Sequence, residues 1–373
     1  MNEQREPLKT QDILNLVFQW SLNGHPNLAE REMSVISQGS TPRWIVPGDA
    51  RSALPVLNSW RPYNATSRFR WKSILVACRF NALLRLPGAS RIIVHCDWSY
   101  WRKWLASFSD SWDVVVHIGN PSHTRKAVAF FVDRVSTIRA VAKLPLTSAA
   151  KDAIVHEADI LKRLPTEYLL PQILFSDQER GIAAQTWIQG SQVTRKFLNQ
   201  HLDLLLQLAR VDGTVRLCDY RDEIANHASK LDLPLEPSLL QYALFLLENP
   251  LELTACIEHR DFAPWNLKWL PNGQLTLIDW EWAVEKGLPW QDVCHFFYIQ
   301  DYLFRGPGKV WDTLIGNPLL QTYARRFGLS GKTLQGLTMY YLLRSLCQDW
   351  VDENNQRVAY AMRQIEAIRD LRT

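Results

Sequence analysis

Two short stretches decide how this chain folds: residues 259–266 read HRDFAPWN, and residues 277–280 read LIDW. The first stretch contains Asp261, whose carboxylate could take a proton from a hydroxyl group, and Asn266. The second contains Asp279. Amide and carboxylate oxygens are ligands that Mg²⁺ accepts, so Asn266 and Asp279 could together hold one or two of these ions. This combination predicts a site for chemistry on magnesium-bound ATP.

The segment between the two stretches predicts a hairpin. Apolar runs lie on both sides of Asn272-Gly273. An Asn-Gly pair is typical of a two-residue type I′ turn, because both turn residues need a positive φ. With this turn, Asn266 would lie directly opposite Asp279 and about 5 Å from it.

An H-x-D-x-x-x-x-N loop that is followed by a hairpin and an Asp resembles the catalytic half of the protein-kinase-like fold. Three details resemble the aminoglycoside phosphotransferase and choline kinase superfamily more than the protein kinases. Ile-Asp-Trp stands where protein kinases have Asp-Phe-Gly, the segment from Asp279 to Asp292 leaves no room for a long activation loop, and an aromatic-rich helix is expected over residues 292–301. The resemblance implies a bilobal α+β fold with a β-rich N-lobe, a mostly helical C-lobe and an additional N-terminal α/β segment.

The resemblance also assigns roles to residues of the two stretches. Asp261 would position the acceptor hydroxyl and take its proton, while Asn266 and Asp279 would hold Mg²⁺. Two further residues would support the loop through hydrogen bonds: His259 and Asp292. Arg260 stands where the aminoglycoside enzymes commonly have glycine, and an ion pair with a nearby acid is its expected role.

Upstream, the sequence predicts an ion pair. A predicted strand ends at Lys143, and Thr147-Ser148 would cap a helix that runs to about residue 164. Glu157 falls in the middle of an otherwise apolar stripe of that helix, where an ionised carboxylate needs a partner. Lys143 is the natural candidate, and the pair matches the lysine and glutamate that orient the ATP phosphates in the family. The alternative is a slightly rotated helix with Glu157 at the solvent edge.

The hairpin that would cover the phosphates is expected over residues 114–126. It contains one glycine, so a G-x-G-x-x-G pattern is absent, and the backbone groups of Ser122 and Thr124 are the candidate phosphate ligands. A plain surface turn is the alternative. The two lobes should join just after a later strand, with adenine bonded to the backbone near Gln185 and Trp187. An ordinary β-strand is the alternative there.

The composition is that of a globular protein. The chain has 373 residues, of which 47% are hydrophobic and 21% charged. This length is enough for two lobes and an extension. We expect an N-terminal extension of unknown role (1–110), a kinase-like N-lobe (111–190) and a helical C-lobe with the catalytic loop and acceptor pocket (191–373). The six cysteines show no C-x-x-C spacing, which argues against a zinc site or a disulfide framework and suits a reducing cytoplasm. Residues 1–10 lack the apolar core of a secretory signal, and no apolar run approaches the roughly 18 residues of a membrane helix.

Positive charge is concentrated in one region. The formal net charge is +4, yet residues 61–103 contain nine Lys and Arg against one acid, with aromatic side chains interleaved. Such a surface could meet anionic lipid head groups, which would make peripheral membrane contact, or a phosphorylated ligand. The simpler interpretation is a cationic helix over residues 68–86 that covers the core with the stems of its basic side chains. We expect no nucleic-acid partner, because the sequence contains no recognisable pattern of a nucleic-acid-binding fold.

These features predict an ATP- and Mg²⁺-dependent phosphotransferase that acts on a hydroxyl group of a small molecule, such as a sugar, an aminoglycoside-like compound or an amino alcohol. The N-terminal extension is similar to those of phosphotransferase-like proteins associated with bacterial cell-surface polysaccharide production. Two other classes stay open. One is a nucleotide-binding pseudokinase, which the glycine-poor loop favours. The other is an accessory scaffold protein that works through residues 1–110.

The sequence indicates two kinds of acceptor only weakly. An aromatic cage for a quaternary ammonium group, as in a choline or ethanolamine kinase, could use three tryptophans: Trp280, Trp282 and Trp290. Core positions are the simpler interpretation of these residues. An acidic pocket for a polycationic aminoglycoside would have to use the one acidic cluster visible in the C-lobe: Asp349, Asp352 and Glu353.

Overall fold

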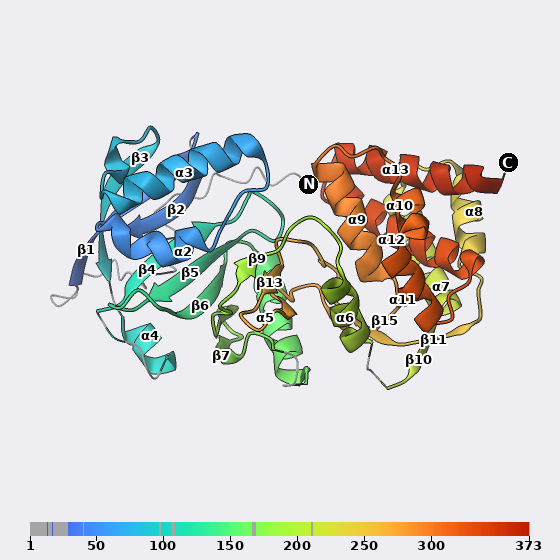
Figure 1. The fold of residues 1–373 in the computed structure, drawn as a ribbon, viewed down its shortest axis with the longest axis horizontal. Helices are drawn as coiled ribbons and strands as arrows, with labels where there is room; N and C mark the ends of the chain where they lie inside the picture. The colour runs from blue at the N-terminus through green and yellow to red at the C-terminus, as the bar shows by residue number, and fades with distance from the viewer. Residues whose placement is uncertain are drawn as a thin grey trace. The chain divides into compact units, whose positions relative to one another are not determined.

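The computed structural model describes residues 13, 17, 29–39, 41–96, 98–105, 109, 111–165, 169–209 and 212–372. The chain divides into two compact units, Met1–Arg163 with Leu169–Gln192 and Leu164–Tyr168 with Val193–Thr373 (Figure 1). The first unit is built on a β-sheet and the second is mostly helical, which gives a mixed α+β architecture. Within the described ranges, no helix combines the length and the apolar character needed to cross a bilayer.

The first unit is organised around one eight-stranded sheet with the order β3-β1-β2-β4-β5-β6-β8-β7. Its strands are β1 (Ala29–Gln38), β2 (Thr41–Pro47), β3 (Ala89–Cys96), β4 (Asp113–Ile118), β5 (Lys126–Val132), β6 (Ile138–Pro145), β7 (Ile173–Asp177) and β8 (Ile182–Gln185), and the two-residue β9 (Ser191–Gln192) ends the unit. Neighbouring strands of the sheet are antiparallel. The proposed boundary near residue 110 therefore falls inside a single sheet.

Both faces of this sheet are buried at β4. Val114 and Val116 belong to one apolar cluster with Trp101, whereas Val115 belongs to a second cluster with Trp71. Successive side chains of a strand point to opposite faces, so each cluster covers one face. The elements that supply covering side chains include the 3₁₀ turns η1 (Ala50–Ala53) and η2 (Leu83–Arg85) and the helices α2 (Leu54–Asn58), α3 (Ala65–Arg79) and α4 (Ser99–Trp104).

Helix α3 carries much of the positive charge predicted for residues 61–103. It begins after Asn64, whose side chain caps the helix by accepting a hydrogen bond from Ser67 N at 2.7 Å. Its inner face buries Trp71 and Cys78, as expected for a helix that covers the core. The outer side and the C-cap expose three large apolar side chains: Phe69, Val76 and Phe80. The prediction that the helix only covers the core with the stems of its basic side chains therefore accounts for the buried face but not for these three exposed apolar residues.

Helix α5 (Ser148–Arg163) follows the prediction closely. Thr147 caps it, because its Oγ1 accepts a hydrogen bond from Ala150 N at 3.1 Å. Its buried stripe includes Ile154, Glu157 and Leu161. The helical period thus places Glu157 on the inner face of the helix.

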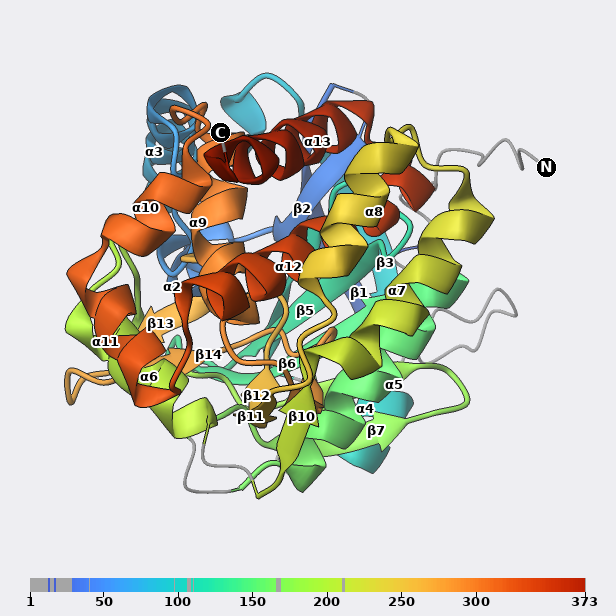
Figure 2. The ribbon, with the colours of Figure 1, turned by 90° about the vertical axis from the view of Figure 1, so that its right-hand side faces the viewer.

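The second unit is a helical assembly with short strand pairs. Its helices are α6 (Asn199–Leu208), α7 (Leu217–Leu231), α8 (Pro237–Leu246), α9 (Gln291–Leu303), α10 (Val310–Gly316), α11 (Pro318–Arg326), α12 (Gly331–Val351) and α13 (Asn355–Arg369), followed by η3 (Asp370–Arg372). Its strands are β10 (Thr214–Arg216), β11 (Glu252–Thr254), β12 (Cys256–Glu258), β13 (Leu267–Trp269), β14 (Leu275–Leu277) and β15 (Val284–Gly287). Figure 2 shows α12 at the centre, where it contacts α7, α8, α9 and α13.

The β13–β14 hairpin is present, but its register differs from the prediction by one residue. Leu267 pairs with Leu277, and Ile278 N donates a hydrogen bond to Asn266 O at 2.9 Å. Asn266 therefore lies opposite Ile278 rather than opposite Asp279. The predicted direct pairing of Asn266 with Asp279 was wrong.

The turn chemistry explains the shift. Leu270 N donates to Gln274 O at 2.9 Å, so three residues form the turn instead of two. Gly273 has φ +82°, while Asn272 stays outside the left-handed region. A turn that ends with one left-handed residue is a common three-residue hairpin loop. The Asn-Gly pair thus marked a hairpin correctly but specified the wrong turn type.

Candidate active site

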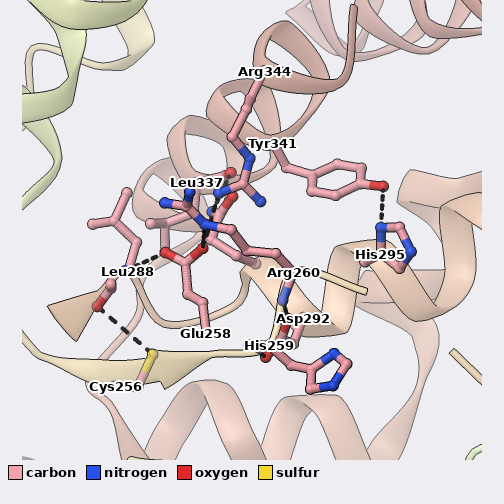
Figure 3. Close-up of polar contacts among 12 residues, drawn as sticks. Cys256, Glu258, His259, Arg260, Leu288, Asp292, His295, Leu337, Tyr341 and Arg344 are labelled. Atoms are coloured by element: carbon pink, nitrogen blue, oxygen red, sulfur yellow. Dashed lines mark hydrogen bonds and ion pairs between the residues drawn. The ribbon is translucent and has the colours of Figure 1, made fainter. Parts of the chain in front are cut away.

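The predicted catalytic loop is held by two elements of the second unit. Strand β12 ends at Glu258, and the loop over residues 259–266 follows it directly. Helix α9 brings Asp292 and His295 to the loop, and Figure 3 shows the contacts around it.

Asp292 fastens the start of the loop. Its Oδ2 accepts a hydrogen bond from His259 N and its Oδ1 accepts one from Arg260 N, both at 2.8 Å. Burial raises the pKa of Asp292 to about 7, and these two N–H donors oppose the rise. Arg260 is held at φ +66°, a conformation that favours glycine.

His259 stabilises the loop from within. Its ring is buried and packs edge-on against Trp280, with 4.8 Å between the ring centroids. Nδ1 lies 3.3 Å from Asp261 N, which can only donate, so Nδ1 accepts and Nε2 carries the proton that it donates to Ile278 O at 3.1 Å. Burial lowers the pKa of His259 to about 4, which leaves the ring neutral at pH 7.

Asp261, the predicted proton acceptor, has both carboxylate oxygens engaged. Asn266 Nδ2 donates to Oδ2 at 2.7 Å and to the carbonyl of Asp261 at 3.0 Å. His295 Nε2 donates to Oδ1 at 2.9 Å. On its other side, His295 contacts Tyr341, whose Oη lies 3.1 Å from Nδ1 (Figure 3). Because a carboxylate only accepts, His295 carries a proton on Nε2, and in its neutral form Nδ1 accepts from the tyrosine. The side chain of Asp261 is 28% exposed, so a hydroxyl group can still reach it.

The sequence analysis missed His295 and Tyr341. His295 lies three residues after Asp292 on α9, and residues at this spacing share a helix face. Because Asp292 was already assigned to the loop, that spacing was a usable signal. Tyr341 is 46 residues further along the chain, and no local pattern connects it to Asp261.

The oxygen atoms of Asn266 and Asp279 suit a Mg²⁺ site. The Nδ2 of Asn266 is used on Asp261, so its Oδ1 points away from Asp261, and no donor in the described part of the chain bonds to that oxygen. Asp279 is partly exposed and has φ +69°. Mg²⁺ commonly takes one or two protein ligands and completes its shell with water and substrate phosphates. The donor set therefore fits Mg²⁺ that arrives with a nucleotide.

Glu258 binds two arginines at the edge of the loop. Its Oε2 accepts from Arg260 Nε at 3.1 Å and from Arg344 Nη1 at 2.9 Å, and its Oε1 accepts from Leu288 N at 2.7 Å (Figure 3). Burial alone would raise the pKa of Glu258, but the two guanidinium groups hold it below its usual value. A β-carbon at Gly287 would lie 2.3 Å from Oε1, so glycine there leaves room for the carboxylate. The ion pair expected for Arg260 is present.

A cavity of about 550 Å³ opens beside the catalytic loop, within the second unit. Asp261 and His295 line it, together with Tyr341, Arg260 and Arg344. Four exposed polar residues also contribute to its wall: Glu223, His227, Gln348 and Asp352. Sites of this volume commonly bind small molecules, and here the predicted proton acceptor faces the cavity.

The side chains considered for the two kinds of acceptor lie mostly away from this cavity. Two of the three tryptophans are core residues: Trp280 and Trp290. Trp282 lines the cavity, and so does Asp352 from the acidic cluster. Asp349 is buried with its Oδ1 3.1 Å from Arg357 Nε, and burial raises the pKa of Asp349 to about 6. The structure therefore offers neither a complete aromatic cage nor a strongly acidic pocket among the residues that the sequence suggested.

Lys143 on β6 and Glu157 on α5 meet in the first unit, as the sequence predicted. Lys143 Nζ lies 2.6 Å from Glu157 Oε1 and also contacts Oε2. The two side chains are only 7% and 3% exposed. The alternative position of Glu157 at the solvent edge is excluded.

The remaining predicted nucleotide contacts lie on the sheet of the first unit. Strands β4 and β5 form the expected hairpin, and its connecting segment contains Ser122 and Thr124. Arg125 N donates to Ser122 O at 3.2 Å and closes a turn there. Gln185 is buried at the end of β8, and the ring of Trp187 packs edge-on against Phe130. Their contacts with a nucleotide stay predictions.

Residues 121–337, more than half of the chain, match the family model described as "Phosphotransferase enzyme family". The chain therefore belongs to the phosphotransferase enzyme family, which confirms the resemblance drawn from its sequence.

Similar solved structures include aminoglycoside phosphotransferase APH(4)-Ia, which is 17% identical over 73% of this chain and 98% of that chain, with a TM-score of 0.49. Choline kinase LicA from Streptococcus pneumoniae is 16% identical over 68% of this chain and 93% of its own, with a TM-score of 0.46. Aminoglycoside 2'-phosphotransferase-IIIa is 15% identical over 74% and 99%, with a TM-score of 0.46. A search of curated proteins finds no match.

Proposed function

We propose that this chain transfers the γ-phosphoryl group of ATP to a hydroxyl group of a small molecule. One observation carries the proposal: Asp261 is fixed by Asn266 and His295 and at the same time lines a cavity of about 550 Å³. A carboxylate in this setting can orient a bound hydroxyl group and accept its proton. Membership in the phosphotransferase family supports the same reaction class.

In the proposed reaction, the acceptor hydroxyl binds in the cavity and donates its hydrogen bond to Asp261. Each carboxylate oxygen has two lone pairs, so the bonds from Asn266 and His295 leave capacity for the substrate. The acceptor oxygen forms the new bond to the γ-phosphorus, the bond from phosphorus to the β–γ bridging oxygen breaks, and the hydroxyl proton moves to Asp261. Most of the rate enhancement would come from positioning and charge stabilisation.

The other predicted residues would hold the nucleotide. Lys143, oriented by Glu157, would contact the phosphates, and the buried ion pair supports this role by fixing the ammonium group. Two residues would hold Mg²⁺ through oxygen atoms: Asn266 and Asp279. Bound Mg²⁺ would neutralise charge on the phosphate oxygens during transfer. Four further residues would contact the phosphates or adenine through their backbone: Ser122, Thr124, Gln185 and Trp187.

The proposal is tested by calorimetry of ATP binding with and without Mg²⁺. The wild type should bind ATP more tightly with Mg²⁺, and Asp279→Ala should remove that difference. Asp261→Asn should bind Mg·ATP nearly as well as the wild type but should not transfer phosphate. Wild-type protein that binds no ATP under either condition would contradict the proposal, and magnesium-dependent binding without turnover on any acceptor would identify a pseudokinase.

The acceptor screen should include sugars, amino alcohols and aminoglycosides. Sugar building blocks of bacterial surface polysaccharides belong in it as well, because the N-terminal extension resembles those of proteins from that context. Production of ADP that depends on one added acceptor would identify the substrate. We place the reaction in the reducing cytoplasm that the cysteine pattern predicts.

A further inference from the structure

Two cationic side chains face the same cavity as Asp261. Arg260 comes from the catalytic loop and Arg344 from α12, and both line the cavity wall. Their side chains are partly exposed, at 30% and 22%. Figure 3 shows both guanidinium groups converging on Glu258. The wall of the cavity therefore carries two arginines that both form an ion pair with the same buried acid, Glu258.

The shared acid does not neutralise the pair. Glu258 carries one negative charge and Arg260 and Arg344 carry two positive charges, which leaves a net charge of +1 for the three side chains. Each guanidinium has five N–H donors, and each uses one on Glu258. In the described part of the chain, no other acceptor forms a hydrogen bond with either guanidinium. Most of their donors thus remain available to a molecule in the cavity.

The cavity wall also carries one further arginine and three carboxylates: Arg357, Asp261, Glu223 and Asp352. Arg357 lies against the buried carboxylate of Asp349, so that pair contributes little net charge. Glu223 and Asp352 are exposed, and water and salt screen charges in such positions. Asp261 is the carboxylate that, in the proposed reaction, accepts the hydrogen bond of the acceptor hydroxyl. Arg260 and Arg344 therefore share one acid between two guanidinium groups, whereas Arg357 has an acid of its own.

We propose that Arg260 and Arg344 form a subsite for an anionic group of the acceptor, so that the substrate carries a carboxylate or a phosphate in addition to its reactive hydroxyl. Guanidinium groups bind both kinds of anion through paired hydrogen bonds. The anion would fix the acceptor with its hydroxyl at Asp261. A polycationic acceptor, by contrast, would meet repulsion at this pair of arginines. This inference rests on the proposed phosphotransfer for its meaning but can be tested by binding alone.

The test compares matched neutral and anionic compounds on the full chain at constant ionic strength. Glycerol is paired with glycerol 3-phosphate and glucose with glucuronate, so that the two arms separate phosphate from carboxylate. Dissociation constants are measured by calorimetry without nucleotide. At least one anionic compound should bind about tenfold or more tightly than its neutral partner, as expected for charged hydrogen bonds.

Arg260→Gly is the most informative variant. Glycine tolerates the φ of +66° at this position, and Glu258 keeps its ion pair with Arg344, so the fold should survive. The variant should lose most of the preference for the anionic compound, and Arg260→Lys should retain part of it. Arg326→Gln is the matched control: it removes one positive charge from an exposed position on α11 outside the cavity and should leave the preference unchanged.

The outcomes separate this inference from the proposed function. If Mg·ATP binds but neutral and anionic compounds bind equally, or Arg260→Gly leaves the preference intact, the anionic subsite is wrong while phosphotransfer stands. If the preference is present and depends on Arg260 but ATP does not bind, the subsite stands and phosphotransfer is wrong.

Discussion

His295 Nε2 lies 2.9 Å from Asp261 Oδ1, and with the bond from Asn266 this contact holds the proposed base on both of its oxygens. His295 is itself oriented by Tyr341. The orientation of the carboxylate is thus set before an acceptor binds. A base that is already positioned avoids part of the entropic cost of reaching the reactive geometry.

Removing this support should slow the chemical step. In His295→Ala, Asp261 loses a hydrogen bond and gains rotational freedom, so we expect kcat to fall by about tenfold or more with little change in the affinity for ATP. His295→Gln keeps an N–H donor and should recover part of the rate. Steady-state kinetics with both substrates would measure the effect. A loss confined to the KM of ATP would contradict the positioning role.

The ion pair between Lys143 and Glu157 should matter for both stability and nucleotide binding. Lys143→Met would leave Glu157 as an unpaired buried carboxylate, which we expect to cost about 3–5 kcal/mol of unfolding free energy. The double variant Lys143→Met, Glu157→Leu should regain most of that stability but should still bind ATP weakly. Urea unfolding and ATP calorimetry on the three proteins would separate the two effects. Recovery of ATP binding in the double variant would show that Lys143 does not contact the nucleotide.

His259 should make the protein sensitive to acid. Its pKa is about 4 when folded and about 6.5 when unfolded, so between these values the unfolded chain binds more protons. The free energy of unfolding should therefore rise with pH across this window, by up to about 1.4 kcal/mol per pH unit from this one group. Asp292 has the opposite effect: its pKa is raised to about 7 in the folded protein, so its contribution to the free energy of unfolding falls as the pH rises.

A comparison with His259→Gln isolates this contribution, because Asp292 is present in both proteins. The stability advantage of the wild type over the variant should grow from pH 4.5 to pH 6.5 and should level off above pH 7. Denaturant unfolding at four pH values would measure it. A constant difference across the range would show that His259 titrates normally in the folded protein.

The outer side of α3 predicts weak binding to anionic membranes. Phe69 and Phe80 are each 74% exposed, and the helix has four basic residues and no acid. Vesicles rich in anionic lipid should therefore bind the protein at low salt and release it at high salt. The double variant Phe69→Ser, Phe80→Ser should bind less. The control variant Leu303→Ser alters an exposed apolar residue of the second unit and should bind vesicles like the wild type. Equal binding by all three proteins would show that the outer side of α3 is not the surface that contacts the membrane.

Local patterns in the sequence predicted the ion pair of Lys143 with Glu157 and the loop that contains Asp261 and Asn266. The position of Glu157 in the buried stripe of α5 and the position of the polar residues in the loop 259–266 were predictable, because helix period and loop length depend on nearby residues. The hairpin register was missed by one residue, since a two-residue and a three-residue turn both accept Asn272-Gly273. Two contacts from α12 could not be predicted: Arg344 with Glu258, and Tyr341 with His295. Both depend on tertiary packing, which brings α12 to the loop from far along the chain.

The continuous sheet of the first unit also has a consequence for how the protein is made. The apolar cluster around Trp44 and Trp71 includes Val115 and Val132, and β2 pairs with β4. A ribosome that has just completed the first 110 residues has therefore produced a strand edge without its partner and an apolar cluster that lacks Val115 and Val132. Such edges invite pairing with other chains. The nascent segment must wait for β4 and β5 to emerge before the edge of β2 is paired and this apolar cluster is complete.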